Sequence, residues 1–178
     1  MKNKEKLFAH LKTIRKHRRV VRKWCFKMGI PLQGLLHDLS KYSLSELSIF
    51  KYYTGTRSPH DTMRDEVGYS SSWFKHRNRN RHHPEYWTDS IEKRTAVKMP
   101  YKYVIEMFCD FVGAGQAYNK NWKPSDSYDY YIKNCKKRII HKDTDVLIEF
   151  LLTQLSIRGE KDFINWYRKN RKLIKGEY

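Results

Sequence analysis

The sequence predicts an all-α protein. Apolar residues recur at helical steps of three and four along most of the 178 residues, and no segment shows the strict alternation of a half-buried strand. The chain also contains no internal repeat and no glycine-rich phosphate loop. We therefore expect one compact domain over residues 1–178, a helical bundle with a core at about 4–117 and additional C-terminal helices at about 127–174.

The first 53 residues predict three helices. A stripe of apolar and histidine side chains indicates a helix from roughly Lys4 to Met28, which Gly29 ends. Pro31 suits the first turn of the next helix. That short helix is expected to be buried, because it carries Leu32, Leu35, Leu36 and Leu39. Ser43 and Glu46 then form a capping-box pattern at the start of the third helix.

The remainder alternates between helices and polar segments. Residues 54–70 are rich in turn-forming and polar residues and indicate a long surface loop. A helix through Trp73 and Phe74 follows, and Pro84 should bend it. Further helices are expected at about 100–117, 128–138, 144–158 and 160–173, with a linker at 118–128. The helix at 144–158 is apolar around most of its circumference, so it should be central.

Composition restricts the partners and the compartment. Lys and Arg number 37 against 19 Asp and Glu, which gives a formal charge of +18 and attracts nucleotides, nucleic acid or other polyanions. No run approaches the roughly 18 apolar residues of a membrane span, and no apolar segment follows the charged N-terminus as in a signal peptide. Cys25, Cys109 and Cys135 are odd in number and widely spaced, which predicts reduced thiols in a cytoplasmic protein.

Four ionisable residues stand at positions where the pattern predicts burial. His17 lies on the apolar stripe of the first helix, His37 and Asp38 lie among leucines, and Asp110 lies on a mostly apolar helix face. Each alone has an ordinary structural explanation as a hydrogen-bonded core residue or a cap. Buried carboxylates without partners are costly, however, and a divalent metal is the simplest partner that all four can share.

These residues lie in motifs that resemble a known superfamily. The order His17, His37-Asp38, Asp110 resembles the HD-domain metal-dependent phosphohydrolases, an all-α fold. The run HDLSK at 37–41 looks like a segment of the branch that hydrolyses cyclic dinucleotides. The set that also includes HHPEYW at 82–87 is closest to a small bacterial and phage family of unknown function. The motifs span roughly residues 10–117.

The resemblance implies a role for each matching position. His17, His37, Asp38 and Asp110 match metal ligands, and the extra histidines of two-metal members correspond to His76, His82 and His83. The implied cofactor is one or two divalent ions (Mn, Fe, Mg, Co, Ni or Zn). Independently, His76, Asn80 and His83 have the spacing of one helical face. The basic residues between them leave open that this stretch only holds phosphates.

The neighbouring residues suggest how a phosphoester would be attacked. Lys41 follows Asp38 by one helical turn and can bind a phosphate oxygen, although a lysine facing water is the alternative. The glutamate that serves as general acid in other branches is missing, so Glu85 and Glu106 are the nearest candidate proton donors. His10 lies on the same face as His17 and is an alternative ligand, whereas His60 and Asp61 are expected at the surface or in a lid.

Together these observations predict a metal-dependent phosphohydrolase or phosphodiesterase that uses metal-activated water. Its substrate would contain phosphate: a nucleotide, a cyclic (di)nucleotide or a nucleic-acid phosphoester. The main alternative is a nucleic-acid-binding helical protein whose His/Asp metal site is structural or inactive. A third is a metal-dependent oxygenase that holds two irons.

Overall fold

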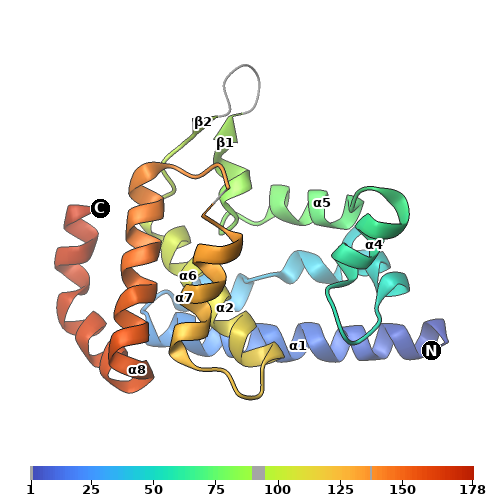
Figure 1. Ribbon diagram of the computed structural model, residues 1–178, viewed down its shortest axis with the longest axis horizontal. Coiled ribbons are helices and arrows are strands. Elements are labelled where there is room, and N and C mark those ends of the chain that lie inside the picture. Colours follow the sequence, from blue (N-terminus) through green and yellow to red (C-terminus); the bar gives the residue numbers. More distant parts are fainter. Residues whose placement is uncertain (1, 90–94, 137) are drawn as a thin grey trace.

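The computed structural model describes residues 2–89, 95–136 and 138–178, and it confirms the all-α prediction (Figure 1). Within these ranges the one sheet is a two-residue pairing, in which β1 (Thr88–Asp89) lies antiparallel to β2 (Thr95–Ala96). No helix of the described ranges is both long and apolar enough to cross a membrane.

The helices follow one another with short connections. In chain order they are α1 (Asn3–Lys27), α2 (Pro31–Leu36), the 3-10 helix η1 (Leu39–Tyr42), α3 (Leu44–Leu47), η2 (Ser48–Tyr52), α4 (Pro59–Val67), α5 (Ser71–Arg79), η3 (Pro84–Trp87), α6 (Tyr101–Tyr118), α7 (Pro124–Asn134) and α8 (Lys142–Glu177). Figure 1 shows α1 running along the molecule, with α7 and α8 in the half where α1 ends and α4 and α5 in the half where α1 begins.

The apolar core lies where α1, α6, α7 and α8 meet. Its fully buried side chains include Val21, Trp24, Phe108, Val112, Tyr131, Leu151, Leu152 and Phe163. Each such side chain contributes about 1.5–3 kcal/mol through the apolar area it removes from water. Helices α1 and α6 pack closely because Gly113 faces Val21, and a Cβ at Gly113 would collide with that side chain. All three cysteines are buried and unpaired by disulfides.

Helix α8 consists of two helical halves. Gly159 has a φ of 73° and a ψ of 170°, so the backbone breaks there as the predicted helices at 144–158 and 160–173 require. The second half folds back onto the first, and Phe150 packs against Trp166 at 5.8 Å between ring centroids. The first half lies in the core as predicted, with Ile148, Leu151, Leu152 and Leu155 fully buried, whereas Val146 and Phe150 on its other side are exposed.

The prediction of a buried leucine-rich helix after Pro31 is wrong. Exposure of 46–59% leaves Leu32, Leu35, Leu36 and Leu39 largely in solvent. Helix α2 packs against α1 through Gly34 instead, where an added Cβ would collide with Cβ of Cys25. The glycine permits a backbone approach that a leucine would prevent, so the leucines face outward.

Four local predictions also need correction. The expected loop at 54–70 contains helix α4, and the expected linker at 118–128 contains the start of α7. Helix α5 ends at Arg79, before the predicted bend at Pro84. The capping box is not formed, because Glu46 is buried and its carboxylate bonds to side chains of other segments.

Candidate metal centre

Three segments bring the first four predicted residues together. Helix α1 contributes His17 from its buried face, and α6 contributes Asp110. His37 and Asp38 occupy the turn between α2 and η1, where Asp38 adopts the left-handed conformation with a φ of 54°. This conformation is uncommon outside glycine, asparagine and aspartate. It reverses the chain immediately after α2 and leaves both side chains almost completely buried.

The ligand atoms of this group are spaced as they would be around one ion. His17 Nε2 lies 3.0 Å from Asp110 Oδ1, 3.3 Å from His37 Nε2 and 3.5 Å from Asp38 Oδ2. His37 Nε2 lies 3.4 Å from both Asp38 Oδ2 and Asp110 Oδ1. Ligands at about 2.1 Å from a metal are about 3.0–3.4 Å apart in octahedral or tetrahedral geometry. We call His17, His37, Asp38 and Asp110 the first ligand group.

A second ligand group forms on the other carboxylate oxygen of Asp38. It comprises Asp38, His76, His82 and His83, each with an atom within 4.8 Å of the others. Asp38 Oδ1 lies 3.3 Å from His76 Nε2 and 3.5 Å from His82 Nε2. The prediction that His76, Asn80 and His83 share one helical face is wrong. The chain leaves α5 at Asn80, and the turn before Pro84 returns His82 and His83 to His76.

Unpaired polar atoms indicate that the second group lacks a partner. Asp38 Oδ1, His82 Nε2 and His83 Nε2 are buried and have no hydrogen-bond partner among the described residues. Buried polar atoms are nearly always hydrogen-bonded, because an unpaired one costs the free energy of its lost hydration. All three atoms belong to potential ligands of one ion. A metal at this position would satisfy them together, so the residues present fit a cation.

Two buried glutamates hold the histidines from behind. His37 Nδ1 and His82 Nδ1 lie 3.0 Å and 3.1 Å from Glu106 Oε1. His76 Nδ1 lies 2.8 Å from Glu46 Oε2. Such contacts keep Nδ1 as the donor and direct each Nε2 toward the ligand groups, where it can bind a metal once it carries no proton, as in carboxylate–histidine–metal arrangements. Glu106 had been predicted as a proton donor, and the role of Glu46 was missed.

The protonation of the metal-free centre follows from its mixture of charges. Burial opposes a charge on His37, but Asp38 and hydrogen bonds to Asp110 and Glu106 raise the pKa of His37 well above its usual value. Burial likewise opposes a charged Asp38, but His37, Lys41 and His76 hold its pKa well below normal. For His83, burial and the neighbouring histidines lower the pKa, which favours the neutral imidazole that metals bind.

Lys41 borders the centre at its accessible side. Its Nζ lies 2.7 Å from Asp38 Oδ2, one turn of η1 after that residue, and its side chain is 25% exposed. Burial lowers the pKa of Lys41, but Asp38 more than offsets this and raises it. Asp110 is 24% exposed, and the exposed Tyr118 lies parallel to His17 with ring centroids 6.2 Å apart. Solvent therefore reaches the first ligand group from this side.

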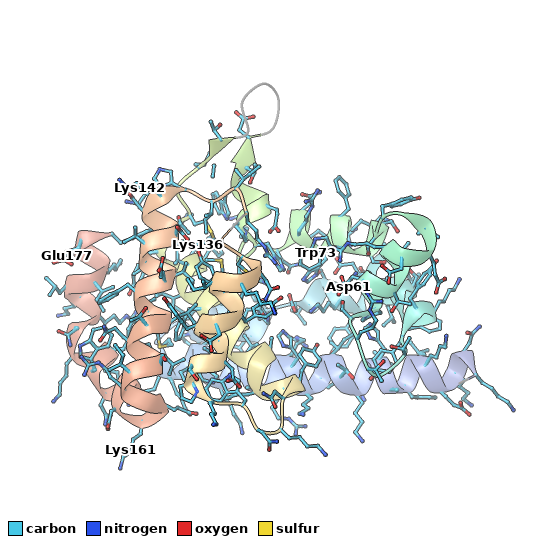
Figure 2. The ribbon with its side chains drawn as sticks, viewed as in Figure 1. Asp61, Trp73, Lys136, Lys142, Lys161 and Glu177 are labelled. Atoms are coloured by element: carbon cyan, nitrogen blue, oxygen red, sulfur yellow. The ribbon has the colours of Figure 1, made fainter. Side chains whose placement is uncertain are left out.

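Trp73 closes the second group on another side. Its ring lies 5.8 Å from that of His76 and 5.0 Å from that of His83. Figure 2 places Trp73 and Asp61 in the α4–α5 part of the molecule, far from Glu177 at the end of α8. His60 of α4 packs on the same tryptophan at 5.5 Å, so α4 adjoins the centre.

Other candidates lie outside the ligand groups. Glu85 pairs with Arg138 at 3.6 Å, and its second carboxylate oxygen is buried without a hydrogen-bond partner. His10 is buried beside Tyr53, with ring centroids 5.5 Å apart, and belongs to none of the potential ligand groups of the described residues. Burial, followed by the charge of Lys41, lowers the pKa of His10 to about 4. Of the two histidines of α1 that were alternative ligands, His17 belongs to the first ligand group and His10 does not.

The comparisons with known proteins yield one family. A sequence profile for the family of unknown function DUF5662 matches residues 6–154. The match includes every segment of both ligand groups and continues into the first half of α8, so it extends well beyond the motifs recognised at 10–117. No curated protein and no solved structure matches the chain.

Proposed function

The chain belongs to the DUF5662 family of unknown function, and we propose from its own site that it is a metal-dependent phosphohydrolase. The substrate would be a nucleotide, a cyclic (di)nucleotide or a nucleic-acid phosphoester. One observation carries the proposal: the two oxygens of Asp38 face two different sets of histidines. Oδ2 lies 3.4 Å from His37 Nε2, and Oδ1 lies 3.3 Å from His76 Nε2. A carboxylate placed in this way can bridge two cations.

In this proposal each ligand group holds one ion. His17, His37, Asp38 and Asp110 would hold one ion, and Asp38 would share the second with His76, His82 and His83. A donor set of imidazoles and carboxylates suits Mn, Fe, Co, Ni or Zn, and suits Mg less well because Mg prefers oxygen ligands. When bound, such an ion lowers the pKa of a coordinated water toward neutrality and so supplies a nucleophile.

The protein's own residues would bind and orient the phosphoester. Lys41 lies at the accessible side of the centre. Its ammonium group can exchange its ion pair with Asp38 for one with a phosphate oxygen as negative charge develops on that oxygen. Glu106 and Glu46 fix the ring orientations of the ligating histidines. Glu85, two residues after His83, remains the proposed proton donor to the leaving group. The HD-like order of ligands supports the same reaction class.

Turnover tests the proposal. Purified protein with Mn²⁺, Fe²⁺, Co²⁺, Ni²⁺, Zn²⁺ or Mg²⁺ is assayed on nucleotides, cyclic dinucleotides, oligonucleotides and bis-p-nitrophenyl phosphate. We expect cleavage of at least one phosphoester, lost in Asp38→Asn and retained in Asp129→Asn, a matched change at an exposed position. Metal binding with no cleavage of any substrate by the wild type would reject the hydrolase and favour a structural or inactive site.

A further inference from the structure

The outer face of α1 carries a line of unpaired positive charges. Six basic residues of this helix are exposed between positions 12 and 23: Lys12, Arg15, Lys16, Arg19, Arg22 and Lys23. This stretch contains no acidic residue. None of the six takes part in an ion pair among the described residues, and the ammonium group of Lys16 donates a hydrogen bond to the carbonyl of Ala117. At 1.5 Å per residue the line is about 16 Å long. We call these six residues the basic face.

The basic face points away from the metal centre. His10, Ile14, His17 and Val21 are buried on one side of α1. At 100° per residue, positions 12, 15, 16, 19, 22 and 23 all fall on the opposite side. In Figure 1 the N-terminal half of α1 forms the lower edge of the molecule. A ligand on the basic face is therefore separated from both ligand groups by the width of the helix.

Two exposed phenylalanines accompany these charges. Phe8 is 60% exposed and Phe26 is 52% exposed. They are 18 residues apart, which corresponds to five full helical turns, so both point in the direction of the basic face. The burial of α1's apolar stripe does not explain them, because they lie on the other side of the helix. Exposed aromatic rings among cations are the combination that binds unpaired bases together with their phosphates.

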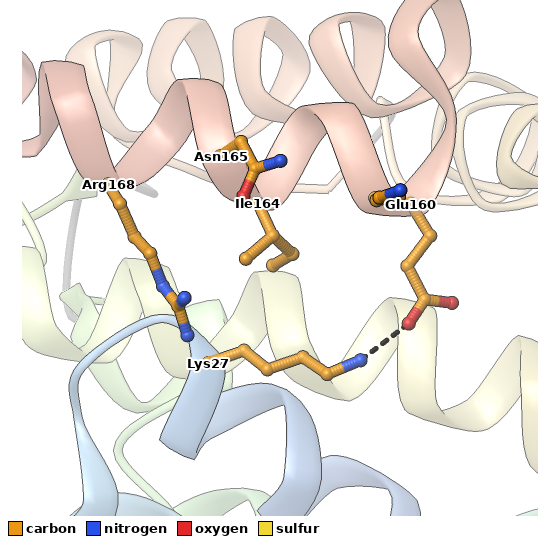
Figure 3. A pocket seen from close by; sticks show the side chains of 6 residues that line it. Lys27, Glu160, Ile164, Asn165 and Arg168 are labelled. Atoms are coloured by element: carbon orange, nitrogen blue, oxygen red, sulfur yellow. Dashed lines mark hydrogen bonds and ion pairs between the residues drawn. The ribbon is translucent and has the colours of Figure 1, made fainter.

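Two shallow, open depressions, called hollows below, lie at the C-terminal end of the basic face. Arg22, Lys23, Phe26 and Lys27 line a first hollow. Lys27 also lines a second one between α1 and the second half of α8, which Lys161, Asn165 and Arg168 border (Figure 3). Within it Lys27 pairs with Glu160 at 2.6 Å, as the dashed line shows. Glu160 offsets the charge of Lys27 there, so the positive surface continues from α1 onto α8 through Lys161 and Arg168.

We propose that the basic face and these hollows bind single-stranded nucleic acid, with phosphates along the cations and a base against Phe26. The ring in the first hollow favours a single strand, because the bases of a duplex are already stacked. It does not favour a membrane surface, because a helix that lies on a bilayer presents its apolar face, and that face of α1 is buried in the protein. The inference goes beyond the proposed hydrolase and does not depend on it.

Fluorescence anisotropy with a labelled oligothymidylate over a series of salt concentrations tests the charges. The triple variant Arg15→Gln/Arg19→Gln/Arg22→Gln should bind more weakly, and its log–log salt slope should be less steep by about 2, since each lost phosphate contact on a single strand contributes about 0.7. The control Lys51→Gln/Lys120→Gln/Lys133→Gln removes the same charge from exposed sites elsewhere and should keep the wild-type slope. An equal change in both triples would overturn the assignment to α1.

The aromatic ring has its own test. Phe26→Leu should weaken binding by about 5-fold or more, since stacking of one base contributes that much, whereas Phe26→Tyr should retain wild-type affinity. Unchanged affinity in Phe26→Leu, equal affinity for duplex DNA, or equal affinity for phosphatidylserine vesicles would each overturn the single-strand proposal. Strand binding is measured without any turnover, so a failure here and a failure of the hydrolase proposal remain distinguishable.

Discussion

The apolar core and the candidate metal centre both include residues of α1 and α6. On α1, Val21 and Trp24 pack in the core, while His17, one turn earlier, faces the centre. On α6, Phe108 is fully buried in the core, while Asp110 belongs to the first ligand group. The two regions differ in what satisfies their side chains. Core residues are satisfied by contact with one another, whereas Asp38 Oδ1, His82 Nε2 and His83 Nε2 of the centre have no hydrogen-bond partner among the described residues.

Because of this difference, we expect the core and the centre to control different properties, folding stability and metal binding. Burial of apolar side chains favours folding without any ligand. Several buried histidines and carboxylates around Asp38 are costly unless a cation compensates them. The core should therefore determine the free energy of unfolding of the metal-free protein, and the centre should determine metal binding. Substitutions in the two regions should affect different measurements.

The largest expected effect is the loss of both metals in Asp38→Asn. Asp38 belongs to both ligand groups, and the amide removes the charge that both ions require while it keeps the shape of the side chain. We expect elemental analysis to fall from two ions per chain to essentially none. Asp129→Asn should retain both ions, and full occupancy in Asp38→Asn would contradict the bridging role.

The converse experiment uses Leu152→Ala. Leu152 is fully buried in the core, so its truncation should lower the free energy of unfolding by about 2–5 kcal/mol, measured by urea denaturation without metal. Metal content at 25 °C should stay at the wild-type value. A parallel loss of metal would show that the two regions cannot be separated.

A smaller effect, on metal affinity, is expected in Glu106→Gln, a change at a residue that contacts two of the candidate ligands. Glu106 accepts hydrogen bonds from Nδ1 of both His37 and His82, and an amide oxygen holds these rings less firmly. Loss of such a partner typically weakens metal affinity about 10- to 100-fold. Competition with a chromogenic chelator measures this change. The matched variant Glu149→Gln, which affects a surface ion pair with Lys136, should have wild-type affinity.

The smallest expected effect is the release of protons when the metal binds. The pKa of His37 in the metal-free protein lies well above 6.5, so this imidazole carries a proton at pH 7. A metal binds the neutral ring, so metal uptake at pH 7 should release about one proton, and affinity should rise with pH until the pKa of His37 is passed. Calorimetry in two buffers of different ionisation enthalpy measures the release. Uptake without proton release would contradict the protonation described here.

Periodicity predicted the elements whose burial is spread along a whole helix face. Helices α1, α6 and both halves of α8 follow the expected ranges. The burial of His17 and Asp110 was predictable for the same reason, since both interrupt apolar stripes. The burial of His37 and Asp38 was predicted from the neighbouring leucines, which are exposed, so that reason was wrong. Short elements were less predictable. Helix α2 has only six residues, and Gly34, not a leucine, fits against α1.

The hydrogen bonds between buried glutamates and the histidines could not be predicted from local sequence patterns. Glu46 has the spacing of a capping box with Ser43, but its carboxylate accepts hydrogen bonds from Ser40 and from His76, which is 30 residues away. No local signal distinguishes the two roles, because the alternative depends on where α5 packs. The convergence of His76 with His82 and His83 likewise depends on the end of α5 at Arg79.

Anomalous X-ray scattering from crystals grown with Mn²⁺ tests the central claim most directly. We predict two anomalous peaks on either side of Asp38, each about 2.1 Å from a different oxygen of its carboxylate. One peak should lie beside His17 and the other beside His76. Crystals that diffract well and show no peak next to Asp38 would contradict the metal centre.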